Sequence, residues 1–158
     1  MIMKRRAIFL VLLLAILWMP ANCGAEWKRL DGKHHQNEYG TQYYMETNMT
    51  YADGSSTQTP IVLFWGKTVF HGKNDPVYAK LINGGCPPDT AAVELKYRVD
   101  INNKKAALVY GILYDAQGRI LSTDEQKKVE YQPIQPDTGA EAVWLIIREM
   151  HAKGAIRK

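Results

Sequence analysis

The chain has 158 residues, of which 46% are hydrophobic and 23% are charged, and its formal net charge is +4. This length fits one domain with or without a leader, and the composition is that of a folded protein. The small charge excess gives no support for nucleic-acid binding, because that function needs a basic face.

The first 25 residues have the layout of a secretory signal peptide. A basic group at residues 4–6 precedes an apolar run at residues 7–18, which is short for a membrane span. We expect cleavage after Ala25, no membrane span in the mature chain, and a periplasmic, cell-surface or secreted location. Cleavage would lower the net charge to +1, because the leader holds three basic residues and no acid. An uncleaved anchor stays open as the alternative.

The two cysteines lie in different parts of the sequence. Cys23 could carry a lipid, although the three residues before it fit the lipidation pattern poorly. Cleavage would leave Cys86 alone, so no internal disulfide is expected. Cys86 lies in a loop rich in Gly and Pro, where it is either a free, reactive or chain-linking thiol or a partly buried small residue.

The N-terminal part of the mature chain predicts a short edge strand at residues 26–30, followed by a polar loop. His34 and His35 in that loop suggest a metal site, but the further ligands that zinc needs are not nearby in the sequence. We therefore interpret both as solvated loop histidines and expect no metal and no cofactor.

Two strands are predicted next, at residues 41–51 and 60–70. The first is rich in Tyr and Thr, which favour strands, and the second contains a continuous apolar run. Gly and Ser between them indicate a turn, so this hairpin is expected to join the main sheet.

Residues 71–88 are predicted to form a long connection because they hold three glycines and three prolines. A small apolar group lies within it, and Lys73 and Lys80 make it mildly basic. Long loops often carry binding residues, so Lys73, Tyr78 and Lys80 are candidate partner-binding residues if they form an exposed patch. A plain crossover between strands is the alternative.

The best-defined part of the sequence is a meander of three antiparallel strands over residues 93–122. Residues 93–101 alternate apolar and charged positions, which indicates one buried and one wet face. Residues 106–114 are apolar almost throughout, which predicts a strand covered on both faces. A turn ending in Gly118 leads into a third strand at residues 119–122.

One C-terminal helix is predicted to cover this sheet. After a charged, exposed stretch at residues 123–128 and an extended segment at residues 131–136, Thr138 and Glu141 form a capping box. The helix carries one apolar stripe with a tryptophan beside it, at Val143, Trp144, Ile146, Ile147 and Met150. Lys153 and Gly154 should end it, and residues 155–158 should form a frayed basic tail.

These elements predict an α+β fold. It has a small antiparallel sheet of about five to six strands, packed by one C-terminal helix. The leader covers residues 1–25, a single domain covers residues 26–153, and a basic tail covers residues 154–158. The sequence contains no nucleophile elbow, phosphate loop, dinucleotide fingerprint or zinc pattern, so we expect no enzymatic activity.

The mature chain resembles the surface-adhesin protein E family of bacterial envelope proteins. The most specific segments are 96–100 (KYRVD), 114–121 (YDAQGRIL) and 131–138 (YQPIQPDT), with 27–30 and 61–65 in the expected order. The resemblance implies an exported adhesin that binds host matrix proteins such as vitronectin and laminin, and plasminogen. Family members commonly have a cysteine pair; Cys86 resembles the first, and residues 148–150 (REM) stand where the second would be.

Three functions therefore remain to be separated. The first is an exported binding module for a protein partner, which uses residues 71–88 or 41–51. The second is a structural envelope protein that binds another envelope component or a second copy, as a monomer or weak homodimer, through an unpaired sheet edge. The third, a small-molecule binder or enzyme, requires a pocket of several hundred Å³ with convergent polar groups between helix and sheet.

Overall fold

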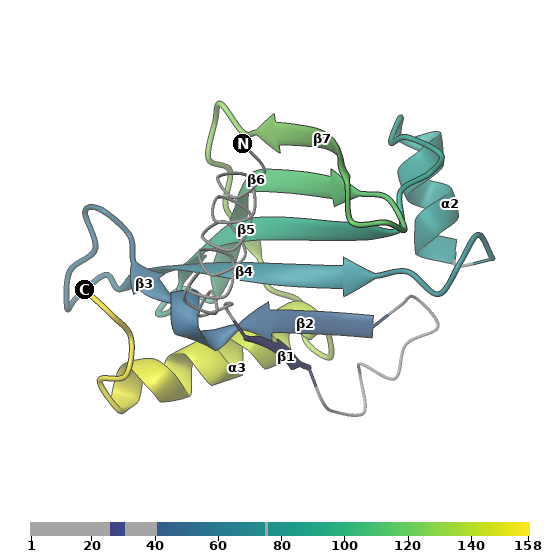
Figure 1. Cartoon of the computed structure of the whole chain (residues 1–158). Coiled ribbons are helices and arrows are strands. Elements are labelled where there is room, and N and C mark those ends of the chain that lie inside the picture. The colour runs from purple at the N-terminus through teal and green to yellow at the C-terminus, as the bar shows by residue number, and fades with distance from the viewer. Residues whose placement is uncertain (1–25, 31–40, 75) are drawn as a thin grey trace, which may run out of the picture.

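A computed structural model of the chain describes residues 26–30, 41–74 and 76–158. The predicted leader, Cys23, His34 and His35 lie outside these residues. Figure 1 shows one twisted sheet with helices against it. The strands are β1 (Trp27–Arg29), β2 (Thr41–Met45), β3 (Thr50–Tyr51), β4 (Ile61–Val69), β5 (Ala92–Asp100), β6 (Lys105–Tyr114), β7 (Ile120–Glu125) and β8 (Gln132–Pro133). The helices are η1 (Glu46–Asn48), a 3₁₀ turn, α2 (Pro76–Asn83) and α3 (Gly139–Ala152).

The strands form one antiparallel sheet in the order β1-β2-β4-β5-β6-β7. The two shortest strands lie off this path, where β3 pairs with β4 and β8 pairs with β6. The predicted α+β class and the 93–122 meander are confirmed, and so are the edge strand β1 and the 41–70 hairpin. The sheet has more strands than predicted because β3 and β8 add two short ones.

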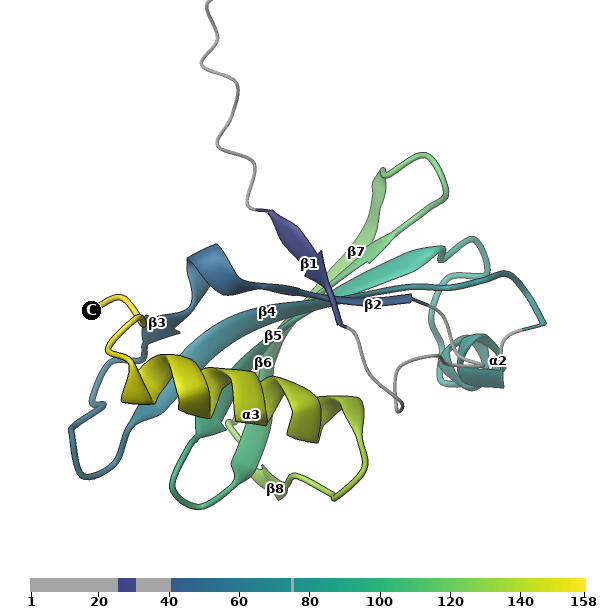
Figure 2. The same ribbon diagram turned by 90° about the horizontal axis from the view of Figure 1, so that it is seen from below.

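The two α-helices, α2 and α3, lie on the same side of the sheet (Figure 2). We call this side the covered face and the opposite side the open face. Val62 of β4 pairs with Val99 of β5, and Phe64 pairs with Tyr97, so alternate residues of the long strands point under α3. The prediction that residues 106–114 are covered on both faces is wrong, because both helices lie on one side.

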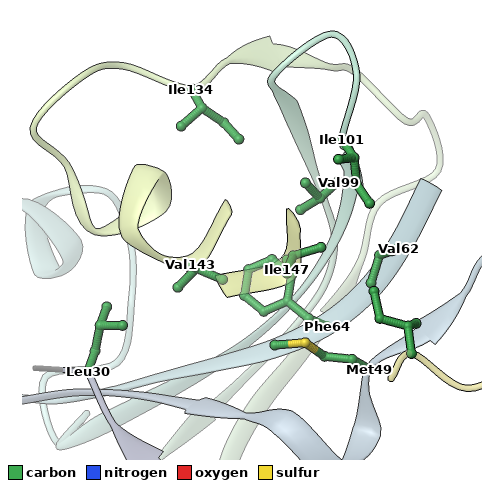
Figure 3. Packing of buried hydrophobic residues seen from close by; sticks show 10 residues of the cluster. Leu30, Met49, Val62, Phe64, Val99, Ile101, Ile134, Val143 and Ile147 are labelled. Atoms are coloured by element: carbon green, nitrogen blue, oxygen red, sulfur yellow. The ribbon is translucent and has the colours of Figure 1, made fainter. Parts of the chain in front are cut away.

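The main core forms where α3 lies on the covered face (Figure 3). Its buried members are Leu30, Met49, Val62, Phe64, Val99, Ile101, Ile134, Val143, Ile147 and Ile156. Ile147 is 0% exposed, and the predicted apolar stripe of the helix is confirmed. Burial of this stripe contributes roughly 1.5–3 kcal/mol for each large apolar side chain.

The predicted capping box of α3 is also present. The Glu141 backbone N–H donates to the Thr138 Oγ1 at 3.3 Å, and the Glu141 carboxylate accepts from the Asp137 N–H at 2.8 Å. The carboxylate thus reaches one residue beyond the usual cap position. Gly154 has a φ of +65° just past the helix, as expected of a C-terminal glycine.

The predicted strand at 41–51 is interrupted. Between the pairs Tyr44–Gly66 and Thr50–Leu63, the chain has more residues than the facing stretch of β4. The surplus forms the 3₁₀ turn η1, and Met49 turns inward to 1% exposure. The alternation expected of one continuous strand therefore stops at Met45.

The C-terminal tail does not fray as predicted. Ile156 is 6% exposed in the main core, and the Tyr51 N–H donates to the Arg157 carbonyl at 3.0 Å. A parallel bridge joins Thr50 and Arg157, which places the C-terminus beside β3 (Figure 2). One apolar residue in a basic stretch is thus enough to dock the tail.

Candidate functional site

The open face carries an unusual mixture of aromatic and charged side chains. The strand register puts ten partly exposed residues there: Tyr43, Leu63, Trp65, Lys67, Glu94, Lys96, Arg98, Tyr110, Ile112 and Tyr114. No described helix covers them. This face is the candidate functional site, because aromatic and cationic residues on a surface of this kind are typical of contacts with proteins.

The centre of the open face is a row formed by Trp65, Lys96 and Tyr110, which pair across β4, β5 and β6. The Lys96 ammonium lies 5.7 Å from the centroid of the Trp65 ring. The Tyr110 ring meets Trp65 edge-on, with centroids 5.9 Å apart and an interplanar angle of 85°. These contacts hold a large aromatic side chain in a defined orientation while leaving it partly exposed.

A second group lies one row further along the same strands. The Lys67 ammonium is 2.9 Å from the Glu94 Oε1, 5.3 Å from the Trp27 ring centroid and 5.6 Å from that of Tyr114. The Tyr114 hydroxyl donates to the Glu94 Oε2 at 3.0 Å. Burial, followed by this bond to a carboxylate, raises the pKa of Tyr114 to about 12. Its hydroxyl therefore stays a donor well above neutral pH.

The 71–88 connection is not a plain loop, because it contains α2. Tyr78 on this helix is 8% exposed; its ring meets Phe70 edge-on at 6.1 Å, and its hydroxyl donates to the Pro88 carbonyl. The predicted role of Tyr78 in an exposed patch is therefore wrong. Lys73 and Lys80 are exposed, and their part in binding stays a prediction.

Cys86 follows the C-terminal turn of α2, and its backbone N–H donates to the Leu81 carbonyl at 3.0 Å. The residue is partly buried and forms no disulfide with any residue that the structure describes. The partly buried interpretation is confirmed, whereas reactivity of the thiol stays a prediction.

A cavity of about 430 Å³ lies between α2 and the covered face. Its lining is mostly apolar and consists of Gln42, Thr68, Phe70, Leu81, Cys86, Val93, Leu95, Leu108, Gly111, Leu113, Ser122, Thr123 and Asp124. The volume is in the range of small-molecule sites. The lining contains a thiol and a carboxylate but no histidine or lysine, so it lacks an evident nucleophile–base pair.

The described histidines are engaged in isolated contacts. The His71 Nε2 lies 2.9 Å from the Thr41 Oγ1, and the His151 Nδ1 lies 2.7 Å from the Tyr51 hydroxyl. Within the described ranges, no three His, Cys, Asp or Glu residues are grouped as metal ligands would be. Over the same ranges, no helix is long and apolar enough to cross a membrane.

Solved structures provide the comparison that decides the fold. Compared by sequence, the chain matches no protein family and no curated protein. Protein E from non-typeable Haemophilus influenzae superposes with a TM-score of 0.55 at 15% identity, over 88% of this chain and 86% of that one. A second crystal form of Haemophilus influenzae protein E gives 0.51 at 17% identity, over 85% and 94%.

The chain has the fold of protein E. A third structure of Haemophilus influenzae protein E agrees, with a TM-score of 0.51 at 18% identity over 85% of this chain and 92% of that one. The resemblance to protein E found in the sequence is thus confirmed for the fold. At this level of identity, the match does not transfer individual binding residues.

Sequence reasoning missed the open face as a site, although it noted its parts. Glu94, Lys96 and Arg98 fall on the wet face predicted for residues 93–101, and Trp65 lies in the strand predicted at residues 60–70. What joins them is the pairing of Trp65 with Lys96 across two strands. The only signal in the sequence was the aromatic content of the positions that alternate with the core.

Proposed function

We propose that this protein is an exported, non-enzymatic binding module of the bacterial cell envelope, which holds a protein partner on the open face of its sheet. The fold shared with protein E and the secretory leader predicted at residues 1–25 support this proposal. A host matrix protein is the partner implied by the resemblance, and a component of the envelope is the other partner class.

The observation that carries the proposal is the row of Trp65, Lys96 and Tyr110 on the open face. Trp, Tyr and Arg side chains contribute much of the binding energy of protein interfaces, particularly in well-packed positions. Here the two neighbours restrain the indole before any partner arrives. A restrained, partly exposed tryptophan loses little side-chain entropy on binding.

Surface plasmon resonance tests this function. The purified protein is passed over immobilised vitronectin, laminin and plasminogen across a salt series. We expect saturable binding at physiological salt that weakens about tenfold or more in Trp65→Ala, the range seen for interface hot spots. Leu145→Ala is the control, because Leu145 is a large apolar side chain, 44% exposed, on α3.

The double variant Lys73→Ala/Lys80→Ala tests the region predicted from sequence in the same assay. Loss of binding in this variant, with Trp65→Ala unaffected, would move the site to α2 and contradict the open-face assignment. Absence of saturable binding to all three proteins would remove the matrix-adhesin form of the proposal and leave an envelope partner.

A structural role is the second candidate, and strand β7 favours it. β7 ends the sheet order, five of its six residues are exposed, and Ile120 is 60% exposed. An exposed edge strand can pair with another strand. Sedimentation analysis would support this role if the protein dimerises and Thr123→Pro, a change that removes an outward-facing backbone donor from β7, abolishes the dimer.

A further inference from the structure

We propose that Arg98, with Lys96 and Lys105, forms a carboxylate-binding subsite on the open face, which takes acidic side chains of the protein partner. This inference rests on the proposed function and names the chemistry of its partner. The subsite lies on β5 and the start of β6, beside Trp65.

The guanidinium of Arg98 forms no ion pair with any residue that the structure describes. Its register neighbours are Leu63 on β4 and Ala107 on β6, both apolar. Its Nε is buried and makes no hydrogen bond with any described residue. A buried polar atom without a partner is costly and therefore calls for an explanation, such as a group that completes the site.

The two lysines of the subsite are also available. Lys96 lies over Trp65, and Lys105 is exposed at the start of β6; neither forms an ion pair with a described residue. Lys67 on the same face differs, because it is paired with Glu94. Lys96 and Arg98 are two residues apart on one strand, so their side chains leave the same face of the sheet about 7 Å apart.

The acid nearest to the subsite in the register is already engaged. Asp100 pairs with Lys105 across the strands, yet its carboxylate accepts from the Asn103 N–H at 3.0 Å and from the Asn103 side-chain amide at 2.8 Å. These bonds hold the carboxylate at the turn without neutralising it, and its single negative charge is outnumbered by the three cations of the subsite. The subsite keeps an excess of positive charge.

A second buried polar atom without a described partner belongs to Tyr131, which lies close to Arg98 in the strand register. Tyr131 directly precedes β8, whose Gln132 pairs with Ala106, and the next residue of β6, Ala107, is the partner of Arg98. The Tyr131 hydroxyl is buried and has no hydrogen-bond partner among the described residues. Two buried polar atoms without described partners in this region call for a group that would satisfy them.

The chemistry favours an acidic protein segment over a polysaccharide. Arginine presents a planar fork that binds a carboxylate through two hydrogen bonds, and lysine adds unspecific positive charge. A sugar ring would need an uncovered aromatic face, but the Lys96 ammonium lies over Trp65 and Tyr110 meets it edge-on.

Fluorescence anisotropy with a fluorescein-labelled deca-glutamate peptide tests the subsite on the purified protein. We expect binding that weakens with salt, falls about tenfold or more in Arg98→Gln, and falls less in Arg98→Lys, which keeps the charge but loses the fork. Lys80→Gln on α2 is the matched control, because it removes one positive charge away from the subsite and should change affinity less than about twofold.

Four outcomes would overturn the proposal. Equal losses in Arg98→Gln and Lys80→Gln would reduce the effect to net charge. Tighter, Arg98-dependent binding of a heparin oligosaccharide would make the partner a sulfated polysaccharide. If thermal unfolding shows that the variants are folded and neither probe binds in an Arg98-dependent way, the subsite is rejected. Loss of matrix-protein binding in Trp65→Ala but not in Arg98→Gln would keep the proposed function and reject the subsite alone.

Discussion

The two faces of the sheet are built from alternate residues of the same strands, but they differ in how deeply their side chains are buried. On the covered face, Val62 pairs with Val99 beneath α3, and both are almost fully buried. One position along, Leu63 pairs with Arg98, and the side chains stay partly exposed. The comparison teaches that burial is concentrated under the helices, whereas the other face carries charged and aromatic side chains that stay partly exposed.

The largest expected difference between the faces is in unfolding. Ile147→Ala removes a side chain that is 0% exposed, so we expect the free energy of unfolding to fall by about 2–5 kcal/mol. Ile112→Ala, on the partly exposed open face, should cost less than half as much. Urea denaturation measures both. Similar losses in the two variants would show that the open face is packed as tightly as the covered face, which would contradict the difference between them.

Alkaline pH tests one tyrosine on each face. Burial raises the pKa of Tyr97 on the covered face to about 12, as it does for Tyr114 on the open face. An unfolded tyrosine titrates near pH 10, so the unfolded chain loses these protons first. The free energy of unfolding should therefore hold below about pH 10 and fall as the pH rises through about 12.

Urea denaturation near pH 9 and near pH 11 measures this fall, which should be smaller in Tyr97→Phe than in the unchanged chain. Glu94→Gln should lower the pKa of Tyr114 and leave that of Tyr97 unchanged, because only Tyr114 bonds to Glu94. Phenolate absorbance follows both titrations. An equal shift of both tyrosines would argue against separate environments on the two faces.

The helix cap sharpens the comparison, because it acts on the covered face alone. Thr138→Ala removes the side-chain acceptor at the start of α3 and should lower the free energy of unfolding by about 1 kcal/mol. Thr138→Ser should restore most of it. Binding to the open face should not change, and a loss of binding in the folded variant would show that the two faces are coupled.

The smallest effect is expected for the cations that lie over tryptophan rings. Lys96→Ala on the open face removes one cation–π contact and should cost less than about 1 kcal/mol. Lys104→Ala should cost more, because Lys104 both lies 5.0 Å from the Trp144 ring centroid and pairs with Glu141 of α3. Thermal unfolding measures both, and the reverse order would contradict the assignment.

Local patterns in the sequence predicted much of this fold. The alternation at residues 93–101 identified β5, and the capping box at Thr138 located the start of α3. Both signals act between residues close in sequence. The helix α2 was missed because the glycines and prolines of residues 71–88 indicated a connection, although proline is well tolerated at the first position of a helix, where Pro76 lies. The apolar group that follows it had helical spacing.

The candidate site was less accessible to prediction. Lys73, Tyr78 and Lys80 were chosen for their composition, but Tyr78 faces Phe70 in a small second core. Whether a side chain is exposed depends on what packs against it, and that partner lies on another strand. The same limit applies to Ile156, which reads as part of a basic tail and lies in the main core.

The sequence by itself determined the class of this protein: which segments become strands, where the last helix begins, and the order that resembles protein E. These properties follow from local backbone preferences and from periodicity. Only the tertiary structure decided that both helices share one face, that Trp65 meets Lys96 and Tyr110, and that Arg98 stands between apolar neighbours. These facts depend on strand register and helix placement, which bring together residues far apart in the chain.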